Sequence, residues 1–420
     1  MTPFPLPIIH SSPFKKRASA AAHPSNPYGH VHTYNDRRHK KNSREVLQDN
    51  RRNEHGAKAR WDTAKCRYAR GRSPVKKTGQ ESLANYEEAA AAYGLTPCFV
   101  KLSDIDVASG FSSVYMKKGP QGYRRQIVPT PEVIHNRAIY DPRSTGVERL
   151  LRQGIQVYNS CNRYGKDQIH GLLEQNRELQ AVLPVTANGL AGLREMMSRY
   201  PDLILKPCRG SVGIGVMRLT RSGEGRWLWS YSISGSRRKV SRVINPDAIP
   251  RALRARLSSV PYLVQERIPL AEINGRPFDL RVTVQRGWGG AWQVTGLFAK
   301  LAAPGGFVSN IARGGEALKS SFALEQAFPG EEAARIRMSV LSLSLAIARE
   351  LEKSLPGLAD IGLDIGVTKH GHLYFIECNG RDQRYGFQKA GLRGVWKDSY
   401  RQPMGYARYL YEEALRTNSY

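Results

Sequence analysis

The sequence predicts an α+β protein in which antiparallel hairpins pack against amphipathic helices. Two apolar strand pairs meet at glycine-containing turns, in "DLILKPCRGSVGIGVMRLT" and in "GLDIGVTKHGHLYFIECN", and such pairs are typical of antiparallel sheets. A helix is expected over 331–354, because its apolar residues recur at helical spacing: Ile336, Val340, Leu343, Ile347 and Leu351. The 420 residues are enough for two or three domains.

Residues 1–77 form a basic, polar leader that we expect to be disordered. They carry 18 Lys+Arg against 5 Asp+Glu, in a chain whose net charge is +28, and they show little hydrophobic periodicity. Two interpretations stay open. The leader is either solvated without a specific role, or it anchors a polyanion such as RNA, DNA or an acidic coat protein.

Other features of the sequence favour a cytoplasmic protein. No run of 18 apolar residues occurs, so no membrane span is expected. The apolar stretch at the N-terminus precedes its lysines, which is the opposite of the order in a secretory signal. The five cysteines are dispersed and include no C-x-x-C pair, so we expect reduced thiols rather than disulfides or a zinc site.

Two structured units are expected after the leader. Residues 78–161 predict a small α/β unit, with a helix at "SLANYEEAAAAYG", a strand at "TPCFVKL" and a hairpin at "SSVYMKKGPQGYRRQIV". Residues 162–395 predict a larger α+β unit, which contains the two strand pairs and the long helix named above. A helix within 396–420, "MGYARYLYEEALR", is expected to pack on this second unit.

The first strand pair contains a glycine cluster that suggests a phosphate-binding loop. A P-loop places its lysine after the glycines, whereas Lys206 precedes them. A Rossmann loop opens a helix, but the segment that follows here is β-like. The loop residues can approach phosphates through backbone N–H groups, and they include Gly210, Ser211, Gly213 and Gly215. An ordinary glycine-rich hairpin without a ligand stays the alternative.

The second strand pair places carboxylates on core strands. Glu377 and Asn379 are two residues apart and share a face of their strand, and pairing about the turn at 370–371 brings Asp364 near Glu377. An oxygen-only set of this kind suits Mg²⁺ held together with substrate phosphates. The alternative is a set of polar residues at strand ends that face solvent.

Three further segments contribute polar side chains. "FDLRVTVQR" places Asp279 and Arg281 on one face, and an arginine in a β-strand suits phosphate or acyl-phosphate oxygens. "SNIARGG" adds Asn310 and Arg313. "LVQERI" is expected to be an edge strand whose backbone reads an adenine at its end.

This order of motifs resembles the ATP-grasp superfamily, and within it the YheC/YheD-like proteins, which are described as endospore coat-associated. The segments that carry the resemblance include "NRYGKDQIHGLL", "LILKPCRGSVGIGV", "VQERIPL", "FDLRVTVQ", "VSNIARGG" and "GLDIGVTKHGHLYFIECNGRDQR", and they extend over roughly 80–400. The resemblance implies an ATP-grasp fold, in which two α+β subdomains hold ATP between them. A small pre-ATP-grasp domain would then precede it at 78–161.

The resemblance also implies roles for individual residues. Nucleotide contacts would come from Lys166, Lys206, the loop from Gly210 to Gly215, Gln265, Glu266, Ile268 and Asp279. One or two Mg²⁺ ions, or Mn²⁺ in their place, would be bound by Asp364, Glu377 and Asn379. Catalytic contacts would come from Arg281, Lys300, Asn310 and Arg313. Lys300 stands where related ligases commonly carry an arginine.

Three functions follow from these features. The first is an ATP-dependent carboxylate–amine ligase that forms an acyl phosphate on an acidic peptide or small-molecule carboxylate. Basic residues after the metal motif (Arg381, Arg384 and Lys389) are expected to favour such an anionic acceptor. The second is an ATP-binding structural or coat-associated protein without turnover. The third is a nucleic-acid-associated protein that binds through its basic leader.

Overall fold

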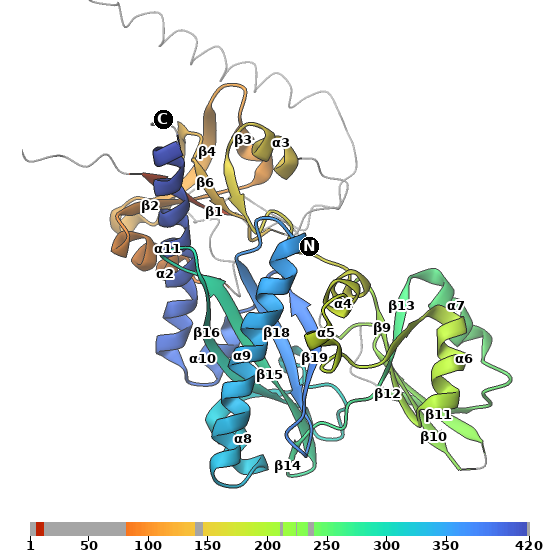
Figure 1. Ribbon diagram of the computed structural model, residues 1–420. Helices are drawn as coiled ribbons and strands as arrows, with labels where there is room; N and C mark the ends of the chain where they lie inside the picture. Colours follow the sequence, from red (N-terminus) through yellow and green to blue (C-terminus); the bar gives the residue numbers. More distant parts are fainter. Residues whose placement is uncertain are drawn as a thin grey trace, which may run out of the picture. The chain divides into compact units, whose positions relative to one another are not determined.

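The computed structural model describes residues 6–11, 81–138, 146–210, 213–223, 225–233 and 239–417 (Figure 1). These residues form three sheets, of seven, six and six strands, in which nearly all neighbouring strands are antiparallel. The α+β class is therefore confirmed. Among the described helices, none is both long enough and apolar enough to cross a membrane.

The N-terminal sheet has the order β3-β4-β2-β1-β6-β7, with β5 on β4. Its strands are β1 (Leu6–Ser11), β2 (Leu95–Val100), β3 (Ile105–Asp106), β4 (Phe111–Lys117), β5 (Tyr123–Pro129), β6 (Val133–His135) and β7 (Gln156–Tyr158). Helices α2 (Leu83–Ala92) and α3 (Gly146–Arg152) accompany it. The strand β1 lies between β2 and β6, within the leader that we expected to be disordered, so that expectation is wrong for these six residues. Residues 12–80 lie outside the described part.

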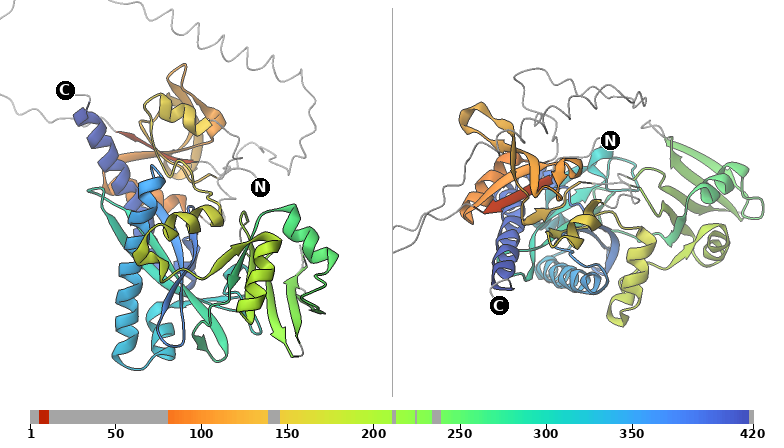
Figure 2. Two further views of the ribbon diagram at one scale, coloured as in Figure 1. Left: turned by 45° about the vertical axis from the view of Figure 1, so that its right-hand side comes forward. Right: turned by 90° about the horizontal axis from the view of Figure 1, so that it is seen from above.

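The second sheet has the order β12-β11-β10-β9-β13-β8. Its strands are β8 (Thr186–Asn188), β9 (Asp202–Pro207), β10 (Met217–Ser222), β11 (Arg226–Ser232), β12 (Lys239–Ile244) and β13 (Tyr262–Glu266). Helices α6 (Gly189–Arg199) and α7 (Arg251–Ser259) share a hydrophobic core with it (Figure 2). The hairpin of β9 and β10 is confirmed. The strand β13 pairs with both β9 and β8, so the expected edge strand is an inner one.

The third sheet has the order β17-β16-β15-β18-β19, with β14 on β15. Its strands are β14 (Glu272–Ile273), β15 (Arg276–Arg286), β16 (Trp292–Leu301), β17 (Glu316–Lys319), β18 (Asp360–Val367) and β19 (Leu373–Asn379). Helix α9 (Glu331–Ser354) covers one face, as Figures 1 and 2 show, and α4 (Lys166–Glu174), α5 (Arg177–Gln180) and α8 (Ser320–Ala327) add to the same core. The helix expected over 331–354 is confirmed, since four of its five stripe residues are buried.

The C-terminal helix joins two parts of the fold. Helix α11 (Arg393–Thr417) follows α10 (Tyr385–Lys389) and begins before the boundary expected at 396. It packs on β15 and β16 as expected, and also on α2 and β6 of the N-terminal unit. Tyr400 and Met404 lie in one core with Tyr86 and Phe99. The boundaries between domains stay a prediction.

Candidate functional site

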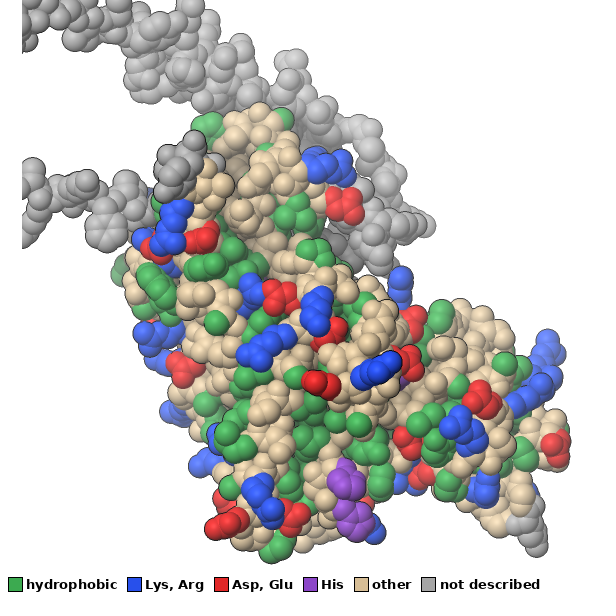
Figure 3. Space-filling model, in the orientation of Figure 1, with side chains coloured by type: hydrophobic (Ala, Val, Ile, Leu, Met, Phe, Trp, Pro, Cys, Tyr) green, Lys and Arg blue, Asp and Glu red, His purple; other side chains and the backbone are tan. Residues whose placement is uncertain are grey.

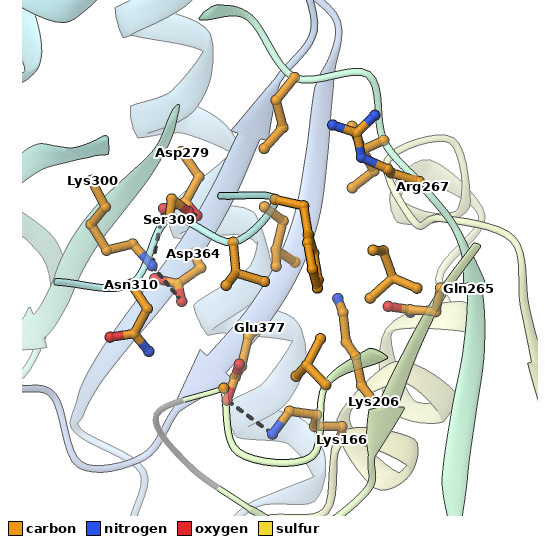
Figure 4. A pocket seen from close by; sticks show the side chains of 18 of the residues that line it. Lys166, Lys206, Gln265, Arg267, Asp279, Lys300, Ser309, Asn310, Asp364 and Glu377 are labelled. Atoms are coloured by element: carbon orange, nitrogen blue, oxygen red, sulfur yellow. Dashed lines mark hydrogen bonds and ion pairs between the residues drawn. The ribbon is translucent and has the colours of Figure 1, made fainter. Parts of the chain in front are cut away.

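A pocket lies between the second and third sheets, and we call it the first pocket (Figure 4). The second sheet and the loops after it contribute Ile204, Lys206, Gln265, Glu266, Arg267 and Ile268. The third sheet contributes Asp279, Lys300, Asp364 and Glu377, and the segment after β16 contributes Phe307, Val308, Ser309 and Asn310. The pocket therefore has apolar side chains on part of its wall and a dense group of charges on the rest.

Strand register explains why the charges meet. Asp364 is opposite Glu377 in the pairing of β18 with β19, as the sequence predicted, and opposite Arg281 in the pairing of β15 with β18. Asp279 is opposite Lys300 in the pairing of β15 with β16. Because alternate residues of a strand share a face, Asp279 and Arg281 both point to the side where Asp364 lies.

Ion pairs connect these residues into one cluster. Lys300 Nζ lies 3.0 Å from Asp279 Oδ1 and 2.9 Å from Asp364 Oδ2, and Arg281 Nε lies 2.8 Å from Asp364 Oδ1. Burial would raise the pKa of Asp364, but Arg281 and Lys300 outweigh it and lower that pKa. Burial dominates at Asp279 and raises the pKa of its carboxyl to about 6. The Asp364 carboxylate thus stays ionised at neutral pH.

Two lysines face this cluster from the other side of the first pocket. Lys166 begins α4, and its Nζ lies 3.0 Å from Glu377 Oε1 and donates to Gly210 O at 3.2 Å. Lys206 points from β9 into the pocket in Figure 4. Burial lowers the pKa of Lys206 to about 8, although Glu377 acts in the opposite direction.

The glycine loop crosses the same pocket. Gly210 and Gly213 line it, whereas Ser211 lies outside the described residues. Gly213 and Gly215 have φ of +66° and +78°, a conformation that favours glycine. Gly215 lies away from the pocket wall, and its carbonyl accepts a hydrogen bond from Tyr262 Oη at 3.1 Å. Gly210 and Gly213 are therefore the glycines of this loop that can approach a ligand in the first pocket.

A second pocket adjoins the first on the far side of the charged cluster. Five residues line both pockets: Gly213, Lys300, Asn310, Asp364 and Glu377. The rest of its wall is formed by Arg281, Phe298, Ile311, Asn379, Gln383, Tyr385 and Gly386. A molecule in this second pocket would lie next to the charged end of a molecule in the first.

Arg313 and Arg384 are not among the residues that line the two pockets, although the Arg313 side chain lies close to Gly213, which lines both. Arg313 is the last residue of a short 3₁₀ turn (Ile311–Arg313). Asn310 precedes this turn, and its side-chain oxygen accepts a hydrogen bond from Ala312 N–H at 2.9 Å. Arg384 was expected to draw an anionic acceptor, and this is wrong. Its side chain is fully buried, donates to Tyr86 Oη at 2.6 Å and pairs with Asp360. Its charge is thus neutralised within the core.

Two functional candidates escaped the sequence reasoning. Asp382 is buried and holds Arg281 through an ion pair of 3.2 Å, while its other oxygen accepts from Thr283. Ser309 donates to the second oxygen of Asp279. The sequence signal for Ser309 was its position beside Asn310, but nothing local marked Asp382 as a partner of a residue 101 positions away.

The oxygen ligands expected for Mg²⁺ do converge. Asp364 and Glu377 are cross-strand neighbours, and Asn379 lies on the same face two residues further along β19. The described residues contain no group of three His, Cys, Asp or Glu that could hold a metal ion. Asp364, Glu377 and Asn379 offer two carboxylates and one amide oxygen, which is the kind of donor set that Mg²⁺ uses together with phosphate oxygens, and their role as metal ligands stays a prediction.

Comparison with known families identifies the fold of this part of the chain. The family model described as "YheC/D like ATP-grasp" matches residues 154–410, which include both pockets. The chain belongs to the YheC/D-like ATP-grasp family. Family membership confirms the ATP-grasp fold that the order of motifs suggested.

Two relatives from Bacillus subtilis (strain 168) are similar to this member of the family. The endospore coat-associated protein YheD is 24% identical over 70% of this chain, and the match spans 66% of YheD, a little under two thirds of its length. The endospore coat-associated protein YheC is 21% identical over 67% of this chain and 79% of its own. Among solved structures, the ATP-grasp ligase PsnB complexed with minimal precursor has a TM-score of 0.42 at 16% identity, over 78% of this chain and 95% of PsnB. That similarity is too low to indicate an activity.

Proposed function

We propose that the protein is an ATP- and Mg²⁺-dependent carboxylate–amine ligase that works through an acyl phosphate. The observation that carries this proposal is the wall shared by the two pockets, which includes Lys300, Asp364 and Glu377. ATP in the first pocket and a carboxylate in the second would meet at this wall. A protein that only binds ATP has no need of a second pocket at the phosphate end.

The charged residues would bind and neutralise the phosphates. Lys166 and Lys206 approach from the glycine-loop side, whereas Arg281 and Lys300 approach from the third sheet. Phosphoryl transfer depends mainly on positioning and charge neutralisation, which these four cations can supply. Mg²⁺, held by Asp364, Glu377 and Asn379 with phosphate oxygens, would add neutralisation at the transferred group.

The proposed reaction has two steps. A carboxylate oxygen of the acceptor attacks the γ-phosphorus of ATP, and ADP leaves. An amine nitrogen then attacks the acyl carbon, phosphate leaves, and the nitrogen loses a proton to give an amide. A loop from Gly210 to Gly215 that closes over the phosphates would exclude water, which otherwise hydrolyses the acyl phosphate.

The acceptor we propose is an acidic peptide or a small-molecule carboxylate. With Arg384 buried in the core, attraction for the carboxylate would come from Arg281 and Lys300, which line the second pocket. Gln383 and Tyr385 add hydrogen-bonding groups to the same wall. These groups support a carboxylate next to amide or hydroxyl groups, as a peptide provides.

The test is mass spectrometry of candidate acidic peptides and metabolites after incubation with the protein, ATP, Mg²⁺ and an amine. We expect ADP release and a mass gain that corresponds to an amide. Lys206→Ala and Glu377→Gln should abolish both, whereas Lys353→Ala, a change at an exposed lysine, should leave them intact. ATP binding without ADP release for every acceptor would contradict the ligase and favour an ATP-binding structural protein.

The names of the two relatives support a second proposal, which concerns location. YheD and YheC are both named as endospore coat-associated, and we propose the same association for this chain. A cytoplasmic location, and contact of the leader with a polyanion, stay predictions.

The charged side chains on the face in Figure 3 are mixed in sign. Lysine and arginine side chains are dispersed among acidic ones rather than gathered in one patch.

The polyanion prediction needs a deletion that spares the fold. Because β1 pairs with β2 and β6, the deletion should remove residues 13–74 and keep Leu6–Ser11. Loss of salt-sensitive RNA or DNA binding in this variant would support a role for the leader. Equal binding by the full chain and the variant would contradict it.

A further inference from the structure

The outer edge of β16 is paired over only part of its length. Strand β17 pairs with β16 from Phe298 to Leu301, and the chain then turns into α8 at Ser320. No described strand pairs with the outer edge of β16 from Trp292 to Leu297, and no backbone hydrogen bond reaches that edge from another described segment. An open edge of this kind leaves backbone N–H and C=O groups available to a further strand.

A groove follows this open edge, and we call it the edge groove. Residues 294–297 of β16 form its floor, and its volume is about 540 Å³. A side chain at Gly296 would collide with Val395 of α11, whereas Leu297 packs in the core that α9 covers. Because consecutive residues of a strand face opposite sides, α9 and α11 stand on either side of the edge. The edge groove is therefore a slot between two helices.

The walls of the edge groove are apolar. Leu341 of α9 lies on one side, and Leu392 and Val395 lie on the other, and all three side chains are half-buried. Met338 precedes Leu341 by three residues, on the same side of α9, and is 57% exposed. A strand directs its side chains alternately to its two faces, so an extended segment in the slot would place apolar side chains against both walls.

The charges at the edge groove are positive. Among the described residues, its charged lining consists of Lys319, at the end of β17, and Arg337 of α9. Both side chains are exposed, and neither forms an ion pair within the described part of the chain. Two cations without a carboxylate beside them complement an acidic partner.

Two other occupants of the edge groove fit less well. The leader of this chain is basic, with 18 Lys+Arg against 5 Asp+Glu in residues 1–77, so the cations of the groove would repel it. A second copy of the chain has the same strand edge at the bottom of the same slot. The helices on either side would therefore collide before the two edges could pair.

We propose that the edge groove docks an extended acidic segment of another protein, which joins the third sheet as a strand beside β16. The backbone of the segment pairs with residues 292–297, and a carboxylate of the segment binds Lys319 and Arg337. The edge groove shares no lining residue with the first or the second pocket. The docked segment is thus separate from the reacting groups, and the inference does not rest on the proposed function.

The test measures dissociation constants of the full chain by fluorescence anisotropy. The probe is a labelled peptide of four valines between pairs of glutamates. A matched peptide with an N-methyl group at every residue carries the same charge but cannot donate backbone hydrogen bonds. The basic leader attracts both peptides alike, so their difference reports strand pairing. We expect the N-methylated peptide to bind at least about tenfold more weakly.

A pair of charge reversals locates the binding. Lys319→Glu combined with Arg337→Glu should weaken binding of the unmethylated peptide by about tenfold or more. The control combines Arg335→Glu with Lys353→Glu, which changes the net charge by the same amount at exposed residues outside the groove. This control should bind the peptide within about twofold of wild type.

Equal affinity of wild type for the two peptides, or no binding of the unmethylated one, would overturn the inference. Equal losses in the two double variants would also overturn it, because the attraction would then come from net charge alone. An oligouridylate of the same charge serves as a further probe. If it binds as tightly as the peptide and loses as much with Lys319→Glu and Arg337→Glu, the groove attracts anions in general and the inference is wrong.

Discussion

At Lys206, burial and neighbouring charges act against each other. Burial lowers the pKa to about 8, while Glu377, Asp364 and Asp279 favour the protonated amine. ATP phosphates next to the amine would favour the protonated form further and raise this pKa. Binding would then take up a proton, so the affinity for ATP is linked to pH.

ATP affinity is expected to be constant below about pH 8 and to fall above it. The fall should reach up to about tenfold per pH unit, since one proton is lost from free Lys206. Calorimetric titrations from pH 7 to pH 9.5 measure it. In Lys206→Arg the guanidinium keeps its proton over this range, so that variant should show a flat profile. A flat profile in wild type would refute this account of Lys206.

At the scale of elements, the site depends on contacts between β15 and the segment after β19. Arg281 projects from β15 and is held between Asp364 of β18 and Asp382 of that segment. Thr283, two residues further along β15, donates to the same Asp382 carboxylate. The backbone carbonyl of Asp382 also accepts from Arg137 at 2.5 Å, which connects the segment to the N-terminal unit.

Asp382→Asn is expected to make the Arg281 side chain more mobile without weakening ATP binding in the first pocket. Turnover should fall by about tenfold to a hundredfold, because Arg281 would no longer be fixed toward the transferred phosphoryl group. The ATP dissociation constant should change by less than about threefold, since Asp382 lines neither pocket. ADP release and calorimetry measure the two effects, with the exposed Asp398→Asn as control. Equal changes in turnover and affinity would contradict a positioning role.

Local patterns in the sequence predicted the elements that carry the site. The helix at 331–354 and the Asp364–Glu377 pairing follow from spacing within one segment. Partners distant in the sequence could not be read in this way: Arg137 and Asp382 are 245 positions apart, although they share a hydrogen bond. The sequence around Arg384 suggested an exposed charge. Its partner Asp360 is distant in the sequence, and no local pattern shows that the two residues form a buried ion pair. The spacing of apolar residues within one segment predicts a helix or a strand, whereas the burial of a charged side chain depends on the tertiary fold.

At the scale of the whole described structure, a buried ionic network connects the N-terminal sheet to the third sheet. His135 Nε2 of β6 lies 3.2 Å from Asp360 Oδ2 of β18, and Asp360 also pairs with Arg137 and Arg384. Burial lowers the pKa of His135 to about 4, although Asp360 acts in the opposite direction. Burial would raise the pKa of Asp360, but Arg384 and Arg137 outweigh it and lower that pKa.

The network predicts a loss of stability in mild acid. His135 takes up a proton below about pH 6.5 in the unfolded chain, but only near pH 4 in the folded protein. The free energy of unfolding therefore falls by about 3 kcal/mol as pH falls across this window. Asp360, with its lowered pKa, adds a further loss at still lower pH. Denaturant unfolding at pH 7 and pH 4.5 measures the effect.

His135→Gln should reduce this pH dependence, because the substituted side chain does not titrate. His372→Gln, a change at an exposed histidine, should leave it as in wild type. If His135→Gln loses as much stability as wild type between the two pH values, the acid sensitivity arises elsewhere.

The central claim is that phosphate passes from the first pocket to a carboxylate in the second. Its most direct test uses an acceptor whose carboxylate carries ¹⁸O, once mass spectrometry has identified one. The phosphate released during amide formation is then analysed by mass spectrometry. An acyl-phosphate route transfers one carboxylate oxygen to phosphate, so we expect one ¹⁸O in each phosphate released per amide formed. Amide formation with unlabelled phosphate would contradict the account.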